Sequence, residues 1–243
     1  QGLLVNGSYQ QEEGITDETT QVADGVTFPL TVTYPTVTNE MMEPVLFRDK
    51  LATYTTDVDG TEGRRTNVRL SAKAINGYVL YPGDVFDYNK IVGQRTEAAG
   101  YKPAGAYSNG ETVEEVGGGI CQVSSTLYYC TLIADLEIVQ RSPHSYVSSY
   151  MPMGMDATVS WGGPHFSFKN STNYPLRIEA KVEDGYVKVQ LIGTDEKDYY
   201  VVMDEPEILG RHYPSTVYEE YPPDNSEGYE EGDVVVTPYT GYS

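Results

Sequence analysis

Cys121 carries the strongest chemical signal in the sequence. It follows three consecutive glycines within the run GGGICQVSSTLYYC. The apolar residues around it recur with a helical period, at Val123, Leu127, Cys130 and Ala134. Cys121 lies off that stripe, about one position inside the predicted helix, where unpaired N–H groups and the helix dipole favour a thiolate. We therefore expect a nucleophilic Cys121 at a helix N-terminus, beside glycines that let a substrate backbone approach closely.

A nucleophilic thiol needs a base, which is most often a histidine. The chain has three histidines, and His144 lies just past a strand predicted after the cysteine helix. Asp156 follows twelve residues later, in a turn into a further predicted strand. The order Cys, His, Asp is that of papain- and transglutaminase-like folds, which is an analogy of chain order only. It predicts that Cys121 attacks, His144 moves the proton, and Asp156 orients and stabilises the imidazole.

Each member of this predicted triad also has a structural interpretation. A free cysteine is often a small buried hydrophobe, which is the interpretation we prefer for Cys130 on the apolar stripe. His144 could close a turn, Asp156 could cap one, and the three glycines could form only a tight turn. The two cysteines are separated by about 13 Å of helical rise, beyond disulfide reach, so we expect both to be reduced.

Further residues near the triad could bind substrate or stabilise an oxyanion. The candidates adjoining the cysteine are Gly118, Gly119, Gln122 and Ser124. The oxyanion donor would be the N–H of Cys121 or Gln122, or the Gln122 amide. Arg95 and Arg141 could clamp a substrate carboxylate, although structural ion pairs would explain either arginine equally well. Aromatic residues such as Tyr150 and Trp161 could line a groove, but core packing is their default. No His/Cys spacing typical of a metal site occurs, so neither a metal nor a cofactor is expected.

The formal net charge of −20 is concentrated in the two ends of the chain. Residues 1–47 and the segment after Arg211 each contain seven acidic residues and no Lys or Arg. Between them, 22 acidic residues face 16 basic ones. Nucleic acid is therefore excluded as a partner, because phosphate binding needs clustered bases, and an anionic membrane surface is disfavoured for the same reason. The sequence carries no signal for an oligomeric state.

The remaining pattern predicts an α+β fold, with a mostly antiparallel sheet and two principal helices. The first helix covers the run RRTNVRLSAKAI, with Thr66 or Asn67 as its N-cap and Gly77 as its stop. Asn109-Gly110 and Asp184-Gly185 each favour a hairpin turn. Strands are expected at residues 26–34, 51–55, 78–81, 106–108, 111–113, 137–140, 146–150, 157–161, 165–169, 176–182, 186–192 and 234–236.

Composition divides the chain into three segments. Residues 1–44 form an acidic β segment that ends in a Pro- and Thr-rich connector, residues 45–193 a compact domain, and residues 194–243 a β extension with an acidic Tyr/Pro/Gly-rich tail. The chain begins with Gln1 and shows neither a signal-peptide pattern nor an apolar run approaching the ~20 residues that span a membrane. We expect it to be part of a longer protein.

Residues 45–193 resemble the VanW-domain family. The stretches that carry the resemblance are NVRLSAKAINGYVLYPGDVFDYNKIVGQRTEAAGYKPA, GGGICQVSSTLYYCTLIADLEIVQRSPHSYVSSYMPMGMDATVSW and FKNSTNYPLRIEA. Asp135 departs from the family pattern, which has glycine there. The first segment resembles the end of a peptidoglycan-binding-like domain that often precedes VanW, and the tail resembles the beginning of a G5 module.

The resemblance implies a function in the cell wall. The family was named from a vancomycin-resistance gene cluster, and some VanW domains are implicated as cysteine L,D-transpeptidases that make 3-3 peptidoglycan cross-links. Cys121, His144 and Asp156 match the family's motif positions, and peptidoglycan stem peptides are the implied partners. The implied location is the cell wall or outer membrane face of a Gram-positive-type bacterium, with an N-terminal anchor missing from this chain. A peptidase using the same thioester, and a non-catalytic peptidoglycan- or glycopeptide-binding module, are the alternatives.

Overall fold

The computed structural model describes residues 4–5, 8–9, 15–23, 26–34, 39–108, 111–145 and 147–204, and four short strands within residues 211–242. The chain divides into two compact units, residues 1–48 and 49–243. In the first unit, β1 (Leu4–Val5) pairs with β2 (Ser8–Tyr9), and β3 (Ile15–Ala23) pairs with β4 (Val26–Tyr34). The strand predicted at 26–34 is therefore confirmed. The connector expected to reach Pro44 is instead partly helical, because good helix formers precede Pro44 in α1 (Asn39–Leu46).

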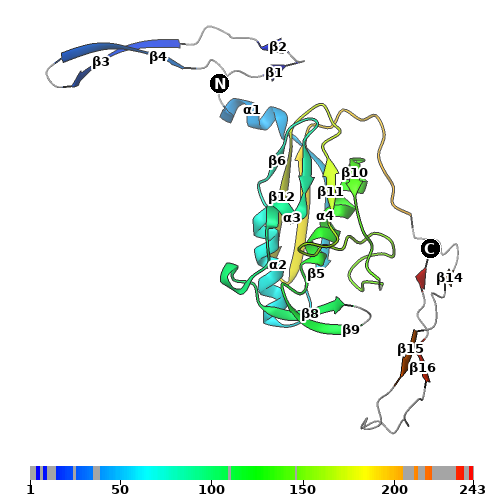
Figure 1. Ribbon diagram of the computed structural model, residues 1–243. Coiled ribbons are helices and arrows are strands. Elements are labelled where there is room, and N and C mark those ends of the chain that lie inside the picture. Colours follow the sequence, from blue (N-terminus) through cyan, green and yellow to red (C-terminus); the bar gives the residue numbers. More distant parts are fainter. Residues whose placement is uncertain are drawn as a thin grey trace. The chain divides into compact units, whose positions relative to one another are not determined.

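A four-stranded antiparallel sheet is the framework of the second unit (Figure 1). Its order is β5 (Asp49–Asp57), β13 (Tyr186–Gly193), β12 (Leu176–Glu183) and β6 (Val79–Leu80). Alternate residues of the two central strands are buried, as the period of two predicts. Asp184 and Gly185 both have positive φ, so the Asp184-Gly185 turn joins β12 to β13 as predicted.

Two long helices pack on this sheet, α2 (Glu62–Ile75) against β12 and α4 (Cys121–Ile133) against β5 and β13. The predicted N-cap of α2 is wrong: Thr61 caps the helix, and its hydroxyl accepts the Arg64 N–H at 3.3 Å. The sequence pattern did not indicate a helix start at Glu62, because Gly63 follows it and glycine is unfavourable inside a helix. A Cβ at Gly63 would meet the Pro103 carbonyl oxygen at 2.6 Å, so close packing explains its presence.

Helix α4 is buried on nearly every side. Its predicted apolar stripe is confirmed, with Val123, Leu127 and Cys130 fully buried. The residues that flank this stripe are also buried, although they include Ser and Thr. The Thr126 hydroxyl donates to the Gln122 carbonyl at 2.7 Å, and the hydroxyls of Ser124 and Thr131 also donate to backbone oxygens. Satisfied hydroxyls let a partly polar helix occupy the core.

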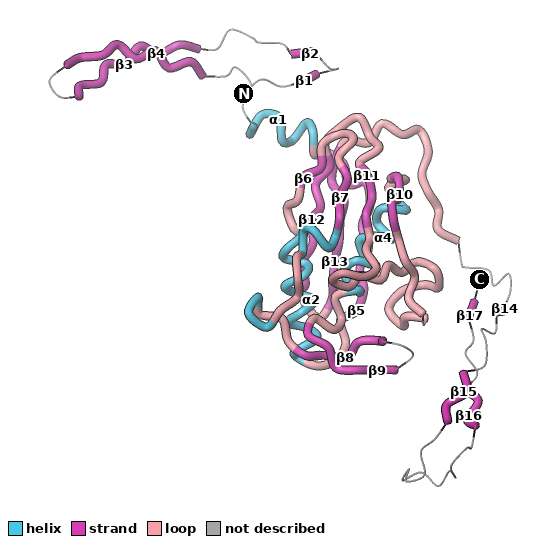
Figure 2. Tube along the Cα trace, viewed as in Figure 1, coloured by secondary structure: helices cyan, strands magenta, loops and turns pink. Residues whose placement is uncertain are grey.

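A second antiparallel sheet has the order β10 (Glu137–Gln140), β11 (Ser167–Lys169) and β7 (Val85–Asp87) (Figure 2). The Phe86 and Phe168 rings pack across β7 and β11 with centroids 5.2 Å apart. Phe166, just before β11, meets the Tyr128 ring of α4 at 5.5 Å. These aromatic contacts join the second sheet to the helix that carries Cys121.

The residues between β10 and β11 form a long loop, which we call the 141–166 loop. Strands predicted at 146–150 and 157–161 are wrong, since the described residues of this loop contain neither strand nor helix. The alternating pattern matched a strand, but the loop bonds to other elements. The Ala157 N–H, for example, donates to the Ser125 hydroxyl of α4 at 2.9 Å.

The smaller elements complete the unit. Helix α3 (Tyr88–Val92) and the 3-10 turn Glu97–Ala99 precede the predicted hairpin, which is β8 (Pro103–Ser108) and β9 (Glu111–Val116). Its turn, Asn109-Gly110, lies outside the described residues. In the C-terminal segment β14 (Arg211–His212) pairs with β17 (Gly241–Tyr242), and β15 (Val217–Glu220) with β16 (Val234–Thr237), where a strand was predicted.

Asp135 ends α4 in the left-handed conformation, with φ of 55°. This is the conformation that glycine adopts most easily, in keeping with the glycine that the resemblance implies at this position. Aspartate is among the residues that tolerate it. The Tyr199 hydroxyl also donates to the Asp135 carboxylate at 2.5 Å, so this chain holds the helix end with a side-chain bond.

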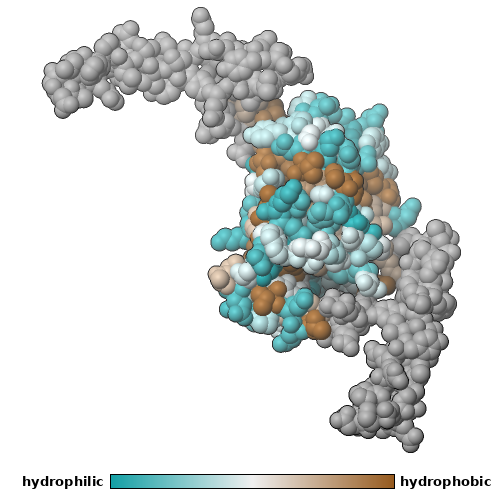
Figure 3. All heavy atoms as spheres, in the orientation of Figure 1, coloured by the Kyte–Doolittle hydropathy of each residue, from teal (hydrophilic) through white to brown (hydrophobic). Residues whose placement is uncertain are grey.

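The visible surface of the second unit is mostly hydrophilic, with hydrophobic patches between polar residues (Figure 3). Exposed apolar side chains include Tyr81 and Val139. Within the described ranges, every helix falls short of the length and apolarity that a membrane crossing requires.

Candidate functional site

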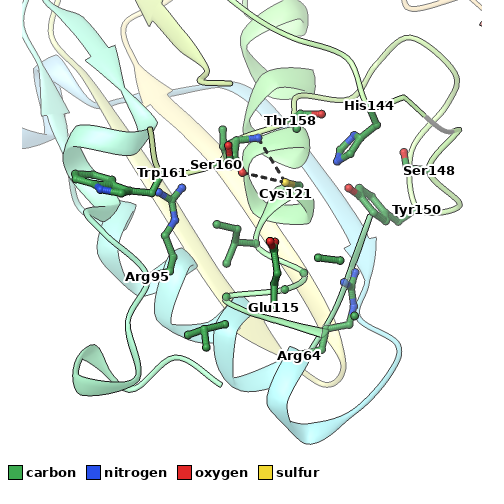
Figure 4. A pocket seen from close by; sticks show the side chains of 18 of the residues that line it. Arg64, Arg95, Glu115, Cys121, His144, Ser148, Tyr150, Thr158, Ser160 and Trp161 are labelled. Atoms are coloured by element: carbon green, nitrogen blue, oxygen red, sulfur yellow. Dashed lines mark hydrogen bonds between the residues drawn. The ribbon is translucent and has the colours of Figure 1, made fainter. Parts of the chain in front are cut away.

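A pocket of about 490 Å³ opens over Cys121 (Figure 4). It is lined by the glycine run, by the β8–β9 hairpin and by parts of the 141–166 loop. Cys121 is the first residue of α4 and is partly exposed. Its thiol donates to the Val159 carbonyl at 3.4 Å, and the Val159 N–H donates to the sulfur at 3.5 Å. The sulfur thus lies at a helix start, in a pocket of a size typical of ligand sites.

His144 also lines this pocket and is held by Asp156. Its Nδ1 lies 2.5 Å from Asp156 Oδ2, and its backbone N–H donates to the same oxygen at 2.7 Å. Asp156 is only 6% exposed. The structure therefore brings Cys121, His144 and Asp156 together. The papain-like arrangement is not confirmed, because both His144 and Asp156 lie in the 141–166 loop and not on strands.

The His144–Asp156 pair favours its charged form. Burial lowers the pKa of His144, but hydrogen bonds to Asp156 and Cys121 outweigh burial and raise the pKa to about 9. Burial raises the pKa of Asp156, but hydrogen bonds from His144 and the charge of Arg141 outweigh it and lower the pKa below its usual range. At neutral pH the site therefore holds an imidazolium on a carboxylate.

This pair predicts a pH dependence of stability. The pKa of His144 is raised from 6.5 to about 9 on folding, so its stabilisation is complete below pH 6.5 and is lost as pH rises through 9. The free energy of unfolding should fall by at most about 3 kcal/mol over this range. Urea unfolding at pH 6, 7.5 and 9.5 measures this. The fall should be smaller in Asp156→Asn, and an equal fall in both proteins would contradict the pairing.

Arg141 binds both the backbone carbonyl and the carboxylate of Asp156. Its Nε donates to the Asp156 carbonyl at 2.6 Å, and its Nη2 donates to Asp156 Oδ1 at 3.0 Å and to the Gly154 carbonyl at 2.7 Å. The guanidinium also lies over the Tyr128 ring, 5.2 Å from its centroid. These bonds use Nε and Nη2, and Arg141 is not among the residues that line the pocket, so we expect Arg141 to act on the site by positioning Asp156.

The three glycines are required by the protein's own packing. Gly117 and Gly119 have φ of 93° and 98°, which glycine adopts at little cost. A Cβ at Gly118 would lie 2.2 Å from the Ala104 carbonyl oxygen, and one at Gly119 would lie 2.7 Å from the Arg64 side chain. The space that we expected a substrate backbone to use at these positions is thus filled by β8 and α2. The run still forms part of the pocket wall.

Gln122 and Ser124 lie in the protein interior and not among the pocket-lining residues. The Gln122 amide accepts from Arg64 at 2.7 Å and donates to Thr56 and to the Asp57 carbonyl. Its backbone N–H donates to Gly119, and the Ser124 hydroxyl donates to the Ala157 carbonyl at 2.6 Å. Of the three predicted oxyanion donors, the Cys121 N–H alone has no hydrogen-bond partner among the described residues.

Some of the residues that line the pocket were not predicted from the sequence, and for others core packing was the preferred interpretation. Thr158, Val159 and Ser160 line the pocket, and nothing in their spacing indicated it. Core packing was the default prediction for Trp161 and a groove the alternative, and the side chain is 55% exposed at the pocket. The Gly162-Gly163 pair directly after Trp161 was the available signal, because it indicates a loop and binding residues lie disproportionately on loops. Burial raises the pKa of Tyr150, which also lines the pocket.

Comparison with known proteins identifies the family. Residues 63–192 match the family model described as VanW like protein. The chain is 44% identical over 163 residues to the uncharacterized protein YoaR of Bacillus subtilis strain 168, covering 67% of this chain and 54% of the relative. It is 31% identical over 128 residues to the vancomycin B-type resistance protein VanW of Enterococcus faecalis, covering 51% and 46%.

The chain thus spans about half the length of the curated relatives it matches. No solved structure matches it. The family model covers more than half of the chain, including Cys121, His144 and Asp156, and confirms the predicted resemblance. The chain belongs to the VanW-like family.

Proposed function

We propose that this chain is a cysteine-dependent acyltransferase of the bacterial cell wall, an L,D-transpeptidase or peptidase acting on peptidoglycan stem peptides. One observation carries the proposal: the Cys121 sulfur lies in a pocket with His144, whose ring is held by the buried Asp156. A relative named as a vancomycin resistance protein supports a role in the wall. A location in the wall or on the outer face of the membrane is part of the proposal.

In the first step, the sulfur attacks the carbonyl carbon of a stem-peptide amide while its proton is held by His144, as the imidazolium that the raised pKa of this histidine favours. A C–S bond forms, and the Cys121 N–H donates to the developing oxyanion. The C–N bond then breaks, and the imidazolium gives its proton to the leaving amine, which departs as a D-amino acid. The rest of the donor remains on Cys121 as a thioester.

In the second step, an acceptor attacks the thioester. An amine from a second stem peptide forms a new amide, which is a cross-link, whereas water forms a carboxylic acid. His144 takes a proton from the acceptor and returns it to the sulfur, while Asp156 keeps the ring oriented. Exclusion of water from the pocket decides between the two products.

A second candidate is a non-catalytic module that binds peptidoglycan or a glycopeptide. The observation that favours it is the exposed Trp161 at the pocket, since exposed aromatic side chains are common at recognition surfaces. In this case the pocket would hold the ligand without forming a thioester.

Intact-mass measurement on the unmodified protein tests the proposal. Incubation with a synthetic stem tetrapeptide should add the mass of the acyl tripeptide to the protein, and peptide mapping should place it on Cys121. Release of the D-amino acid should match the adduct, and prior treatment with iodoacetamide should prevent both. Tight binding without adduct or release would favour the binding module, and neither binding nor adduct would contradict both candidates.

A further inference from the structure

Two buried side-chain polar atoms have no hydrogen-bond partner within the described part of the chain, Arg95 Nε and Thr158 Oγ1. Both residues line the Cys121 pocket. Unpaired buried polar atoms are rare in folded proteins, because each loses its hydrogen bonds to water. Their coincidence in one pocket indicates that this pocket is built for a polar ligand.

Arg95 is the stronger of the two signals because it carries a charge. It is 8% exposed, and its guanidinium donates to the Asn89 side-chain oxygen at 2.6 Å and to the Gly93 carbonyl at 3.1 Å. Both partners are neutral, and no carboxylate of the described residues lies within ion-pair distance. Glu115 lines the same pocket, but it is exposed. A buried cation normally has an anionic partner, and none of the residues that the structure describes supplies one.

The surrounding residues hold Arg95 in the pocket wall. The Asn89 amide that receives Arg95 also donates to the Ser160 carbonyl at 2.9 Å, which ties the arginine to the 141–166 loop. Gly117 packs against the arginine stem, where a Cβ would lie 2.8 Å from Arg95 Cβ. The guanidinium lies over the Tyr88 ring, 5.9 Å from its centroid. The arginine is therefore fixed before any ligand arrives, as a recognition group should be.

The position of Arg95 indicates which part of the substrate this side chain would contact. In Figure 4, Arg95 and Trp161 lie on one side of Cys121, and His144 lies on the other. The leaving amine must lie near His144, from which it receives its proton. The acyl part of the donor then extends from the sulfur in the opposite direction, toward Arg95.

We propose that Arg95 binds a carboxylate on the acyl part of the donor stem peptide. This inference rests on the proposed function for its substrate class and specifies which portion of that substrate is recognised. Stem peptides that contain meso-diaminopimelate offer two carboxylates there, the α-carboxylate of γ-linked D-glutamate and the side-chain carboxylate of the diamino acid. A guanidinium binds either one through paired, charge-assisted hydrogen bonds.

Calorimetric titration of Cys121→Ala, which cannot turn the peptide over, tests the proposal. Four tetrapeptides are compared: both carboxylates free, D-glutamate amidated, diaminopimelate amidated, and both amidated. Amidation of the recognised carboxylate should weaken binding at least about tenfold, whereas amidation of the other should change it less than about twofold. The single amidations thereby distinguish the two sources. Equal affinity for all four, or no binding of any, would overturn the proposal.

Arg95→Met in the same background should bind the free and amidated peptides alike. Arg69→Met is the matched control, since it removes a positive charge from an exposed ion pair with Glu62, outside the pocket. It should keep the full discrimination, and its loss there would overturn the proposal. If Arg95→Met does not fold, the four-peptide comparison decides by itself.

The outcome for Arg95 is separable from that for catalysis. Discrimination between the peptides, with no thioester ever detected on the unsubstituted protein, would retain the carboxylate site and remove the proposed reaction. Thioester formation at equal rates from free and amidated donors would retain the reaction and overturn the role of Arg95.

Discussion

Cys121→Ala is expected to remove the acyl-enzyme adduct and to lower the rate of D-amino acid release by at least about 10⁴-fold. The reason is that the sulfur forms the covalent bond to the donor, and losses of this size or larger follow removal of a covalent nucleophile. The initial rate of D-amino acid release from a stem tetrapeptide measures the effect. Cys121 is the first residue of α4, and alanine is a good helix former, so the substitution should leave the helix intact.

Cys130→Ala is the matched control because it removes the other thiol from the same helix. Cys130 is fully buried, and its thiol donates to the Val189 carbonyl at 3.4 Å. Burial raises the pKa of Cys130, which keeps this thiol protonated and unreactive. The variant should keep its rate and lose only about 1 kcal/mol of stability. Retained activity in Cys121→Ala, or a comparable loss in Cys130→Ala, would refute the assignment of the nucleophile.

His144→Ala is expected to slow acyl-enzyme formation about 10²- to 10⁴-fold, the usual contribution of a general acid–base group. The loss has two sources: no group then takes the thiol proton, and no imidazolium protonates the leaving amine. Single-turnover mass spectrometry isolates this step from the attack of the acceptor. Asp156→Asn should cause a smaller loss, because the ring stays in place but its charged form is no longer stabilised by a carboxylate.

His165→Ala supplies the comparison for His144→Ala. The His165 Nδ1 lies 3.9 Å from the Asp87 carboxylate, and this histidine is not among the residues that line the pocket. Its replacement should leave the acylation rate unchanged within about twofold. If His144→Ala acylated as fast as the unsubstituted protein between pH 6 and 9, another group would have to carry the proton.

Local periodicity predicted the elements that bury one regular face. The alternation in β12 and β13, the Asp184-Gly185 turn and the apolar stripe of α4 all appear as expected. The same reasoning failed in the 141–166 loop, where residues 157–161 alternate like a strand. Periodicity describes a segment alone, whereas a strand also needs a neighbour for its N–H and C=O groups. Here Ser125 and Cys121 bond to the loop backbone instead.

The proximity of three site residues was predicted better than the packing around them. The structure brings Cys121, His144 and Asp156 together, as their chain order and the family resemblance predicted. The location of Gln122 could not be predicted, because its contacts with Arg64 and Thr56 depend on segments more than fifty residues away. Nothing in the sequence indicated that α4 is buried on its polar face as well. The location of Gln122 and the burial of α4 both depend on tertiary packing, which local sequence patterns do not describe.

The strands β10 and β11 are hydrogen-bonded neighbours, so the 141–166 loop leaves and re-enters the sheet at adjacent positions. Insertions in the exposed part of such a segment need not shift the register of either strand. His144 and Asp156 both lie on this segment, whereas the Cys121 sulfur lies on the core helix. Under the proposed function, sequence changes in the exposed part of the loop would alter proton transfer and leave the nucleophile in place, while the buried Ala157 and Val159 keep the rest of the loop attached to the core.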